Sequence, residues 1–184
     1  MRSLRNLLML ASVLLLGYCG FALADGWIYQ YRQSERFEKL LHAPVSSTGV
    51  PPAWAGGIIG RIEAPRIGIS VVVMEGASAS ILRHAAGHIP GTALPGEPGN
   101  VGISAHRDTF FRPLRDIRRN DTITVSTLGG EYRYYVVSTR IVMPDDVSVL
   151  DAGSDQVLTL VTCYPFYFIG PAPRRFIVRA RRVI

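Results

Sequence analysis

The stretch LTLVTCYPFYF, residues Leu158 to Phe168, carries apolar and β-branched residues up to a cysteine, after which aromatic residues and a proline follow. Such a run predicts a β-strand over Val157–Thr162. Because successive side chains of a strand point to opposite faces, Leu158 and Leu160 are expected to point into the core. Cys163 would then lie on the outer face. The stretch therefore predicts a β-fold that presents a thiol at the end of a strand.

The last apolar run of the chain predicts a neighbouring strand that begins near an arginine. Its side chains alternate between an inward face (Phe176, Val178, Ala180) and an outward face (Arg175, Ile177, Arg179). If the two strands pair, the Cys163 thiol and the Arg175 guanidinium share the outer surface. Arg174 is expected to bend away into the preceding loop, because an inward guanidinium would lose its hydration.

Other short β-rich runs alternate with turn residues from Ile58 onward. The candidate strands are Ile58–Ile62, Ile67–Val73, Asn100–Ala105, Thr122–Thr127, Tyr132–Thr139, Val157–Thr162 and Phe176–Arg182. Gly129-Gly130 supplies the turn of a tight hairpin. Helix is expected only over Ser78–Ala86 and Pro113–Arg118. Many short strands at regular spacing predict an all-β closed barrel or sandwich.

The composition is typical of a globular protein with a packed core, and the chain has only two cysteines. The chain has 184 residues, 48% of them apolar, and a formal charge of +6 in which Lys39 is the only lysine. The basic residues are scattered and form no motif of a nucleic-acid binder, so no nucleic acid is expected as a partner. The second cysteine, Cys19, lies in an apolar segment, which makes a disulfide with Cys163 improbable. Cys163 is then a buried small side chain or a working thiol.

An uncharged segment, Leu7–Ala24, follows Arg2 and Arg5. As a helix it would span about 27 Å, close to the hydrocarbon thickness of a bilayer. The preceding arginines favour a cytoplasmic N-terminus and a catalytic domain outside the membrane. The alternative is a cleaved signal peptide, because Ala22-Leu23-Ala24 resembles a cleavage site.

These features divide the chain into three parts. Residues 1–25 form the membrane anchor or signal peptide. Residues 26–57 combine a weakly amphipathic helical pattern over Gly26–His42 with a Pro- and Gly-rich linker over Pro44–Gly57. Residues 58–184 form the β-barrel domain.

Among the histidines, His106 is the strongest candidate for chemistry, because it follows a strand directly, where scaffolds carry catalytic groups. His84 and His88 are spaced like two metal ligands on a helix, but Gly87 lies between them and no acidic or cysteine ligand accompanies them. His42 is expected to be solvated. His106-Arg107-Asp108 spells the kinase catalytic triplet, but the other kinase motifs are absent and the match is attributed to chance.

A thiol, an imidazole and a guanidinium together form a set that can transfer acyl groups. The Cys163 thiolate would attack a carbonyl carbon, the His106 imidazolium would protonate the leaving amine, and Arg175 would stabilise the oxyanion.

The chain resembles the sortases, most closely those of class D. The resemblance rests on TLVTCYPFYFIGPAPRRFIV (Thr159–Val178), HIPGTALPGEPGNVGISAHRDTFFRPLRDI (His88–Ile117) and the N-terminal anchor. It implies an eight-stranded β-barrel and a cysteine transpeptidase that cleaves an LPxTG-like sorting signal of an exported protein after threonine. An amine from a cell-wall precursor or a pilin subunit would resolve the thioester. No cofactor and no metal is implied.

The resemblance also assigns residues. Cys163 is the nucleophile, His106 the general acid and base, and Arg175 the oxyanion and substrate anchor. Thr162 would contribute a hydroxyl or backbone donor, Met143–Asp155 one wall of the signal's groove, and Tyr164, Phe166 and Tyr167 the opposite wall.

Two features depart from the family's pattern or could extend it. Ala105 stands where relatives carry glycine, and its methyl group is expected to narrow the groove. Some sortases bind calcium near the loop that here carries Asp145, Asp146, Asp151 and Asp155, but these carboxylates are expected to be solvated.

Two further readings stay open. A cysteine peptidase would use the same thiol and histidine with water as acceptor. A non-enzymatic, membrane-tethered β-domain would bind anionic wall polymer and would not need the Cys163 thiol. The glycine-cysteine signature of an L,D-transpeptidase is absent.

Overall fold

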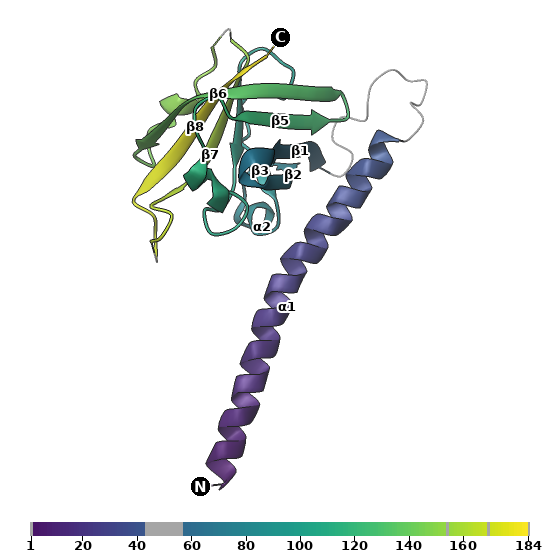
Figure 1. Cartoon of the computed structure of the whole chain (residues 1–184), viewed down its shortest axis with the longest axis vertical. Coiled ribbons are helices and arrows are strands. Elements are labelled where there is room, and N and C mark those ends of the chain that lie inside the picture. Colours follow the sequence, from purple (N-terminus) through teal and green to yellow (C-terminus); the bar gives the residue numbers. More distant parts are fainter. Residues whose placement is uncertain (1, 43–56, 154, 169, 184) are drawn as a thin grey trace.

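A closed barrel of eight β-strands forms the body of the protein (Figure 1). The computed structural model describes residues 2–42, 57–153, 155–168 and 170–183. The strands are β1 (Ile58–Ala64), β2 (Ile69–Glu75), β3 (Ala86–His88), β4 (Asn100–Ser104), β5 (Thr122–Thr127), β6 (Gly130–Val142), β7 (Val157–Tyr164) and β8 (Arg174–Arg182). Their order around the barrel is β1-β2-β3-β4-β7-β8-β6-β5. The strand pattern allowed a barrel or a sandwich, and the closed eight-stranded barrel that the family resemblance implies is confirmed.

Short helical segments connect the strands, and one long helix precedes them. They are α1 (Arg2–Leu41), η2 (Pro65–Ile67), α2 (Ala79–Leu82), η3 (Arg112–Asp116) and η4 (Val147–Leu150). The loop from β6 to β7 contains η4, and the chain between β4 and β5 contains η3.

All seven strands expected from the sequence are present, with bounds that differ by a few residues. The start of β2 differs because Pro65 begins a 3₁₀ turn through Ile67, and Gly68 ends it with a left-handed backbone (φ 70°). The expected helix over Ser78–Ala86 is wrong in its second half. It ends at Leu82, and Ala86 begins β3. This strand is held by pairing with β2 and β4 rather than by a local pattern.

The two strands at the site have the predicted inward faces. Leu158 and Leu160 of β7 and Val178 and Ala180 of β8 belong to the core cluster, and Phe176 packs against it. Leu158 lies opposite Ala180, and Leu160 lies opposite Val178. Hydrophobic burial of these alternate residues therefore turns the residues between them, including Cys163 and Arg175, to the outer face.

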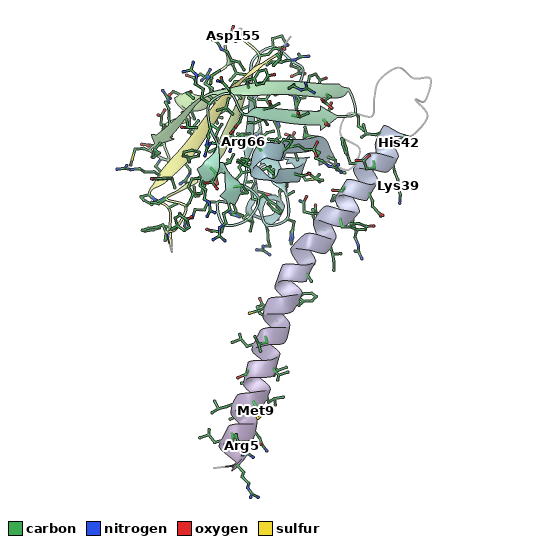
Figure 2. The ribbon with its side chains drawn as sticks, in the orientation of Figure 1. Arg5, Met9, Lys39, His42, Arg66 and Asp155 are labelled. Carbon is green, nitrogen blue, oxygen red and sulfur yellow. The ribbon has the colours of Figure 1, made fainter. Side chains whose placement is uncertain are left out.

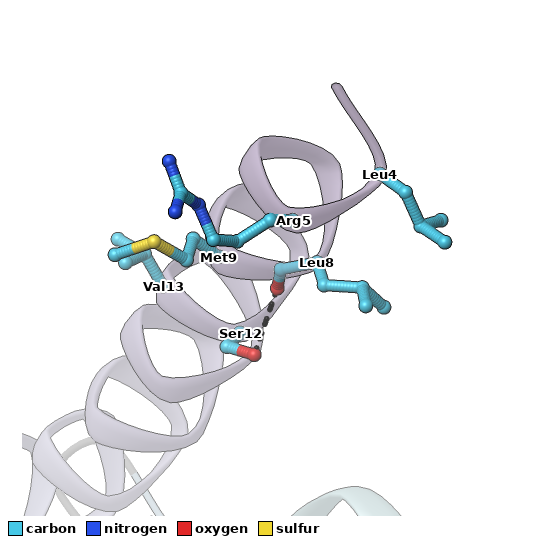
Figure 3. A pocket seen from close by; sticks show the side chains of 6 residues that line it. All are labelled: Leu4, Arg5, Leu8, Met9, Ser12 and Val13. Carbon is cyan, nitrogen blue, oxygen red and sulfur yellow. Dashed lines mark hydrogen bonds between the residues drawn. The ribbon is translucent and has the colours of Figure 1, made fainter. Parts of the chain in front are cut away.

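Helix α1 is the one helix in the described part of the chain that is long and apolar enough to cross a membrane, judged by length and composition. Figure 2 labels Arg5 and Met9 near its free end and Lys39 and His42 near the barrel. A shallow hollow on its first turns is lined by Leu4, Arg5, Leu8, Met9, Ser12 and Val13, and the Ser12 hydroxyl donates to the Leu8 carbonyl (Figure 3).

The end of α1 packs against the outside of the barrel. Phe37 is fully buried in a small cluster with Ile58 and Val72. Gln30 donates to the carbonyl of His84 and accepts the backbone N–H of Val72. The helical pattern expected over Gly26–His42 thus continues α1 without a break. Most of the expected linker, residues 44–56, lies outside the described residues.

Candidate active site

Cys163 and Arg175 lie directly opposite one another on two hydrogen-bonded strands. The antiparallel register of β7 and β8 pairs them, and it pairs the next residues outward, Tyr164 and Arg174. Cys163 is a free, half-buried thiol. The Arg175 guanidinium is half-buried and donates to the carbonyls of Ala172 (3.2 Å) and Arg174 (3.1 Å). Arg174 belongs to β8, where a loop position was expected, and its side chain is exposed at the end of the barrel.

His106 lies just past the end of the neighbouring strand β4, level with Cys163. β4 runs parallel to β7 and pairs Ser104 with Val161. His106 comes two residues after Ser104, as Cys163 comes two residues after Val161. The connection continues past the end of β4, because the Ala105 N–H donates to the Val161 carbonyl (3.3 Å). The exposed His106 side chain therefore leaves the barrel beside the end of β7 that carries Cys163.

Thr162 and Ala105 hold this strand end together rather than facing the groove. The buried Thr162 hydroxyl donates to the Ala105 carbonyl (2.8 Å), so it faces the barrel wall and is already engaged. Ala105 is buried, and its side chain belongs to the core cluster. The expectation that its methyl group narrows the groove is therefore wrong, because that methyl group packs inward.

The aromatic residues after Cys163 form a cluster at the end of the barrel. The ring of Phe166 lies edge-on to Tyr164 (centroids 6.0 Å apart) and to Phe176 (5.3 Å). Tyr164 and Phe176 are stacked at 6.4 Å. Tyr164 and Phe166 are half-buried, so each keeps a partly open surface at this end of the barrel, although Phe166 also packs against the core cluster.

The loop from β6 to β7 covers part of the outer face of the barrel, over β4 and β8. Asn100 is buried and holds this loop: its amide donates to the carbonyls of Val149 (3.0 Å) and Asp151 (3.4 Å). Its carbonyl oxygen accepts the hydroxyl of Thr159 (2.7 Å). Leu150 lies so close to Gly102 that a Cβ there would come within 3.1 Å of its side chain.

The covering loop leaves a hollow of about 80 Å³ on the outer face of β6 and β8, lined by Ser138, Arg140, Val149, Ile177 and Arg179. Ile177 and Arg179 follow Arg175 on the same face of β8. The outer face of β8 thus extends from Arg175, opposite Cys163, to the hollow that Val149 of η4 helps to line.

The two histidines with metal-ligand spacing are not arranged as ligands. His88 is buried on β3, where Nδ1 contacts a Glu75 carboxylate oxygen and Nε2 contacts the Ala93 carbonyl, each at 3.0 Å. The His84 ring lies against the ring of Tyr29 from α1 in a tilted arrangement (centroids 5.0 Å apart). Asp155 forms a surface ion pair with Arg181 (3.0 Å). Across the described residues, no group of three or more His, Cys, Asp or Glu side chains is arranged to hold a metal ion.

Arg107, directly after His106, is a buried residue beside the candidate site to which sequence reasoning assigned no role. Its side chain is buried, and it donates to the carbonyls of Pro165 (2.9 Å), Phe168 (2.6 Å) and Gly170 (3.1 Å) in the loop between β7 and β8. No local pattern predicts this, because the acceptors are backbone atoms about sixty residues away in the chain. The only signal was an arginine beside the candidate histidine.

Comparison with known proteins identifies the family and the fold. A family model of the sortase domain matches residues 62–183. The chain is 36% identical over 129 residues to Sortase D of Bacillus subtilis, an alignment that covers 70% of this chain and 65% of that protein. It is 28% identical over 110 residues to Sortase A of Listeria monocytogenes, covering 58% of this chain and 49% of that protein. The chain thus spans less than two thirds of the length of these curated relatives.

Solved structures show the same fold. A Sortase D5 transpeptidase of Clostridium perfringens superposes with a TM-score of 0.71 at 25% identity, covering 84% of this chain and 98% of that chain. Sortase C1 of Streptococcus agalactiae superposes with a TM-score of 0.65 at 30% identity, covering 82% of this chain and 77% of that chain.

Proposed function

Because this chain belongs to the sortase family, we propose that it is a cysteine transpeptidase whose nucleophile is Cys163. The observation that carries the proposal is the pairing of Cys163 with Arg175 across β7 and β8, with His106 leaving the parallel neighbour of β7 at the same height. A nucleophile, a proton donor and an oxyanion partner then come from three adjacent strands. Such a rigid arrangement favours acyl transfer, because little reorganisation is needed at the reacting carbon.

In the first step the Cys163 thiolate attacks the carbonyl carbon of the scissile amide, and the carbonyl electron pair moves to the oxygen. Arg175 stabilises this oxyanion. When the intermediate collapses, the C–N bond breaks, the His106 imidazolium gives its proton to the departing nitrogen, and a thioester remains on Cys163. In the second step an amine attacks the thioester, neutral His106 takes the proton of that amine, and the thiolate is released.

For the substrate we propose an exported protein with an LPxTG-like sorting signal, cleaved after threonine. The outer face between Cys163 and η4 is the proposed place for the extended signal, and Tyr164 and Phe166, which follow Cys163 in the chain, are the proposed opposite wall. Thr162 supports the site because its hydroxyl holds the chain at the end of β4, and its backbone N–H is the proposed donor to the substrate. The proposed acceptor is an amine of a peptidoglycan precursor or of a pilin lysine.

For the organisation of the chain we propose a membrane anchor over residues 1–25, a juxtamembrane region over 26–57 and a catalytic domain over 58–184. Arg2 and Arg5 favour a cytoplasmic N-terminus. The catalytic domain would then lie outside the membrane, where sorting signals arrive.

The test uses the full chain in detergent with LPxTG- and LPxTA-type peptides and hydroxylamine as the acceptor. We expect a hydroxamate at the threonine, and no product with Cys163→Ala. Undiminished cleavage by that variant would disprove the thioester mechanism. If product formation did not depend on the added amine, the chain would instead be a cysteine peptidase. If neither peptide reacted while anionic wall polymer bound equally well to the Cys163→Ala variant, the non-enzymatic reading would hold.

A further inference from the structure

The Arg107 side chain ties together two segments that bear the proposed catalytic residues. It is only 5% exposed and follows His106 at the end of β4. Among the described residues its side chain donates to the carbonyls of Pro165, Phe168 and Gly170, which all belong to the loop that leaves β7 after Tyr164 and enters β8 at Arg174. The loop therefore connects the strand of Cys163 to the strand of Arg175.

The contact is specific for a guanidinium. Three carbonyls along one loop require several donors in a fixed planar arrangement, which arginine has and lysine lacks. The guanidinium carbon also lies 5.8 Å from the centre of the Phe168 ring. A buried cation is costly unless it is compensated, and here the carbonyls and the ring compensate it.

The neighbouring Asp108 does not account for the burial of this charge. Its carboxylate is 70% exposed and lies 3.4 Å from Arg107 Nε. That nitrogen makes no hydrogen bond among the described residues, so the two charges are close but poorly aligned. The hydrogen bonds of the Arg107 guanidinium are directed at the loop.

We propose that Arg107 is a positioning residue that locks the β7–β8 loop against the end of β4 and so holds His106, Cys163 and Arg175 in register. This inference rests on the proposed function, since it concerns the same site. Each of the three residues is close in the chain to a segment that Arg107 holds. His106 is the residue directly before Arg107, Cys163 lies just before the β7–β8 loop, and Arg175 lies just after that loop. A small displacement of catalytic groups, of the order of 1 Å, costs about 10²-fold in rate.

The first test compares Arg107→Lys with wild type in the full chain. We expect kcat for hydroxamate formation to fall by about 10- to 100-fold with KM changed less than about threefold, because, among the described residues, Arg107 does not contact the η4 wall of the proposed groove, whereas the reacting groups lose alignment. Arg112→Lys is the matched control: Arg112 is exposed on η3, lies five residues further along, and has no ion pair or side-chain hydrogen bond among the described residues. It should retain wild-type kcat and KM.

The second test measures opening of the β7–β8 loop by limited proteolysis and does not depend on enzyme activity. Tyr167 and Phe168 are exposed on the β7–β8 loop, so chymotrypsin can cut there when the loop opens. Cleavage at these residues should be about tenfold faster in Arg107→Lys than in wild type or Arg112→Lys, while the melting temperature of the barrel stays within a few degrees. If the wild type cleaves no sorting peptide, the proposed function fails, yet this measurement still decides whether Arg107 locks the loop.

A third variant covers the case in which Arg107→Lys does not fold. Phe168→Ala removes the ring beside the guanidinium from an exposed position, and the barrel should stay intact because Phe168 is not part of the core cluster. It should lower kcat by about two- to fivefold and speed chymotrypsin cleavage at Tyr167. Unchanged kcat and unchanged loop cleavage in a folded Arg107→Lys, or in Phe168→Ala where the former does not fold, would overturn the proposal. So would a loss confined to KM.

Discussion

At the scale of single residues, the two adjacent arginines of β8 differ in position and should differ in effect. Arg175 is half-buried opposite Cys163 on the outer face, whereas Arg174 is exposed at the end of the barrel opposite Tyr164. A guanidinium placed on a developing oxyanion contributes about 10²–10³ in rate, and the rounded ammonium group of lysine cannot reproduce its planar donors.

We therefore expect Arg175→Lys to lose about 10²–10³-fold in kcat/KM for hydroxamate formation and Arg174→Lys to lose less than about threefold. Both variants should melt at the wild-type temperature, since neither side chain is buried in the core. The reverse order of activities, with unchanged melting curves, would mean that Arg174 is the residue that acts on the oxyanion.

At the scale of elements, one ion pair joins η2 to the chain that follows η3. The Arg66 guanidinium donates to both carboxylate oxygens of Asp121, and the Arg118 N–H donates to the same carboxylate at 2.6 Å. The hydrogen bond from Arg66 is the largest influence that holds the pKa of Asp121 below its ordinary value of 3.8.

The sign of the pH dependence follows from this shift. A carboxyl whose pKa is lower in the folded state contributes stability that is fully present above its unfolded pKa of about 4 and is lost as the pH falls through its folded pKa. We expect the melting temperature to fall more steeply below about pH 4 in wild type than in Asp121→Asn. At pH 7 the variant should melt at a lower temperature, because it lacks the ionic partner of Arg66. Parallel pH profiles for the two proteins would show that this pair is not coupled to folding.

At the scale of the whole molecule, α1 links the proposed anchor to the barrel as one continuous helix (Figure 1). Its last turns are attached to the barrel by buried Phe37 and by an ion pair between Glu38 and Arg61 (3.0 Å). Arg61 also lies over the Phe37 ring at 5.8 Å. A barrel attached in this way would be held at a short distance from the bilayer.

We expect protein isolated from cells to be in the membrane fraction, to need detergent for its release, and to retain residues before Ala24. N-terminal sequencing and intact mass measure this directly, and protease added to intact cells should reach the barrel. A soluble protein that begins at Asp25 would instead establish a cleaved signal peptide.

Local sequence pattern determined the strands and the faces they bury. The alternation of Leu158 and Leu160 in β7, and of Val178 and Ala180 in β8, predicted the inward sides correctly, because a two-residue period and hydrophobic burial act within a single strand. The outward placement of Cys163 and Arg175 followed from the same period. The face-to-face pairing of these two residues also needed the assumption that β7 and β8 are neighbours, which the register confirms.

Tertiary structure alone decided the features that depend on contacts between distant segments. Three-residue β3 has no period to detect, and it exists because β2 and β4 both pair with it. Ala105 packs into the core and the Thr162 hydroxyl bonds to its carbonyl because β4 lies parallel to β7. Arg107 is buried because the β7–β8 loop brings three carbonyls to it. Backbone acceptors leave no mark on the sequence, so only the folded chain could reveal them.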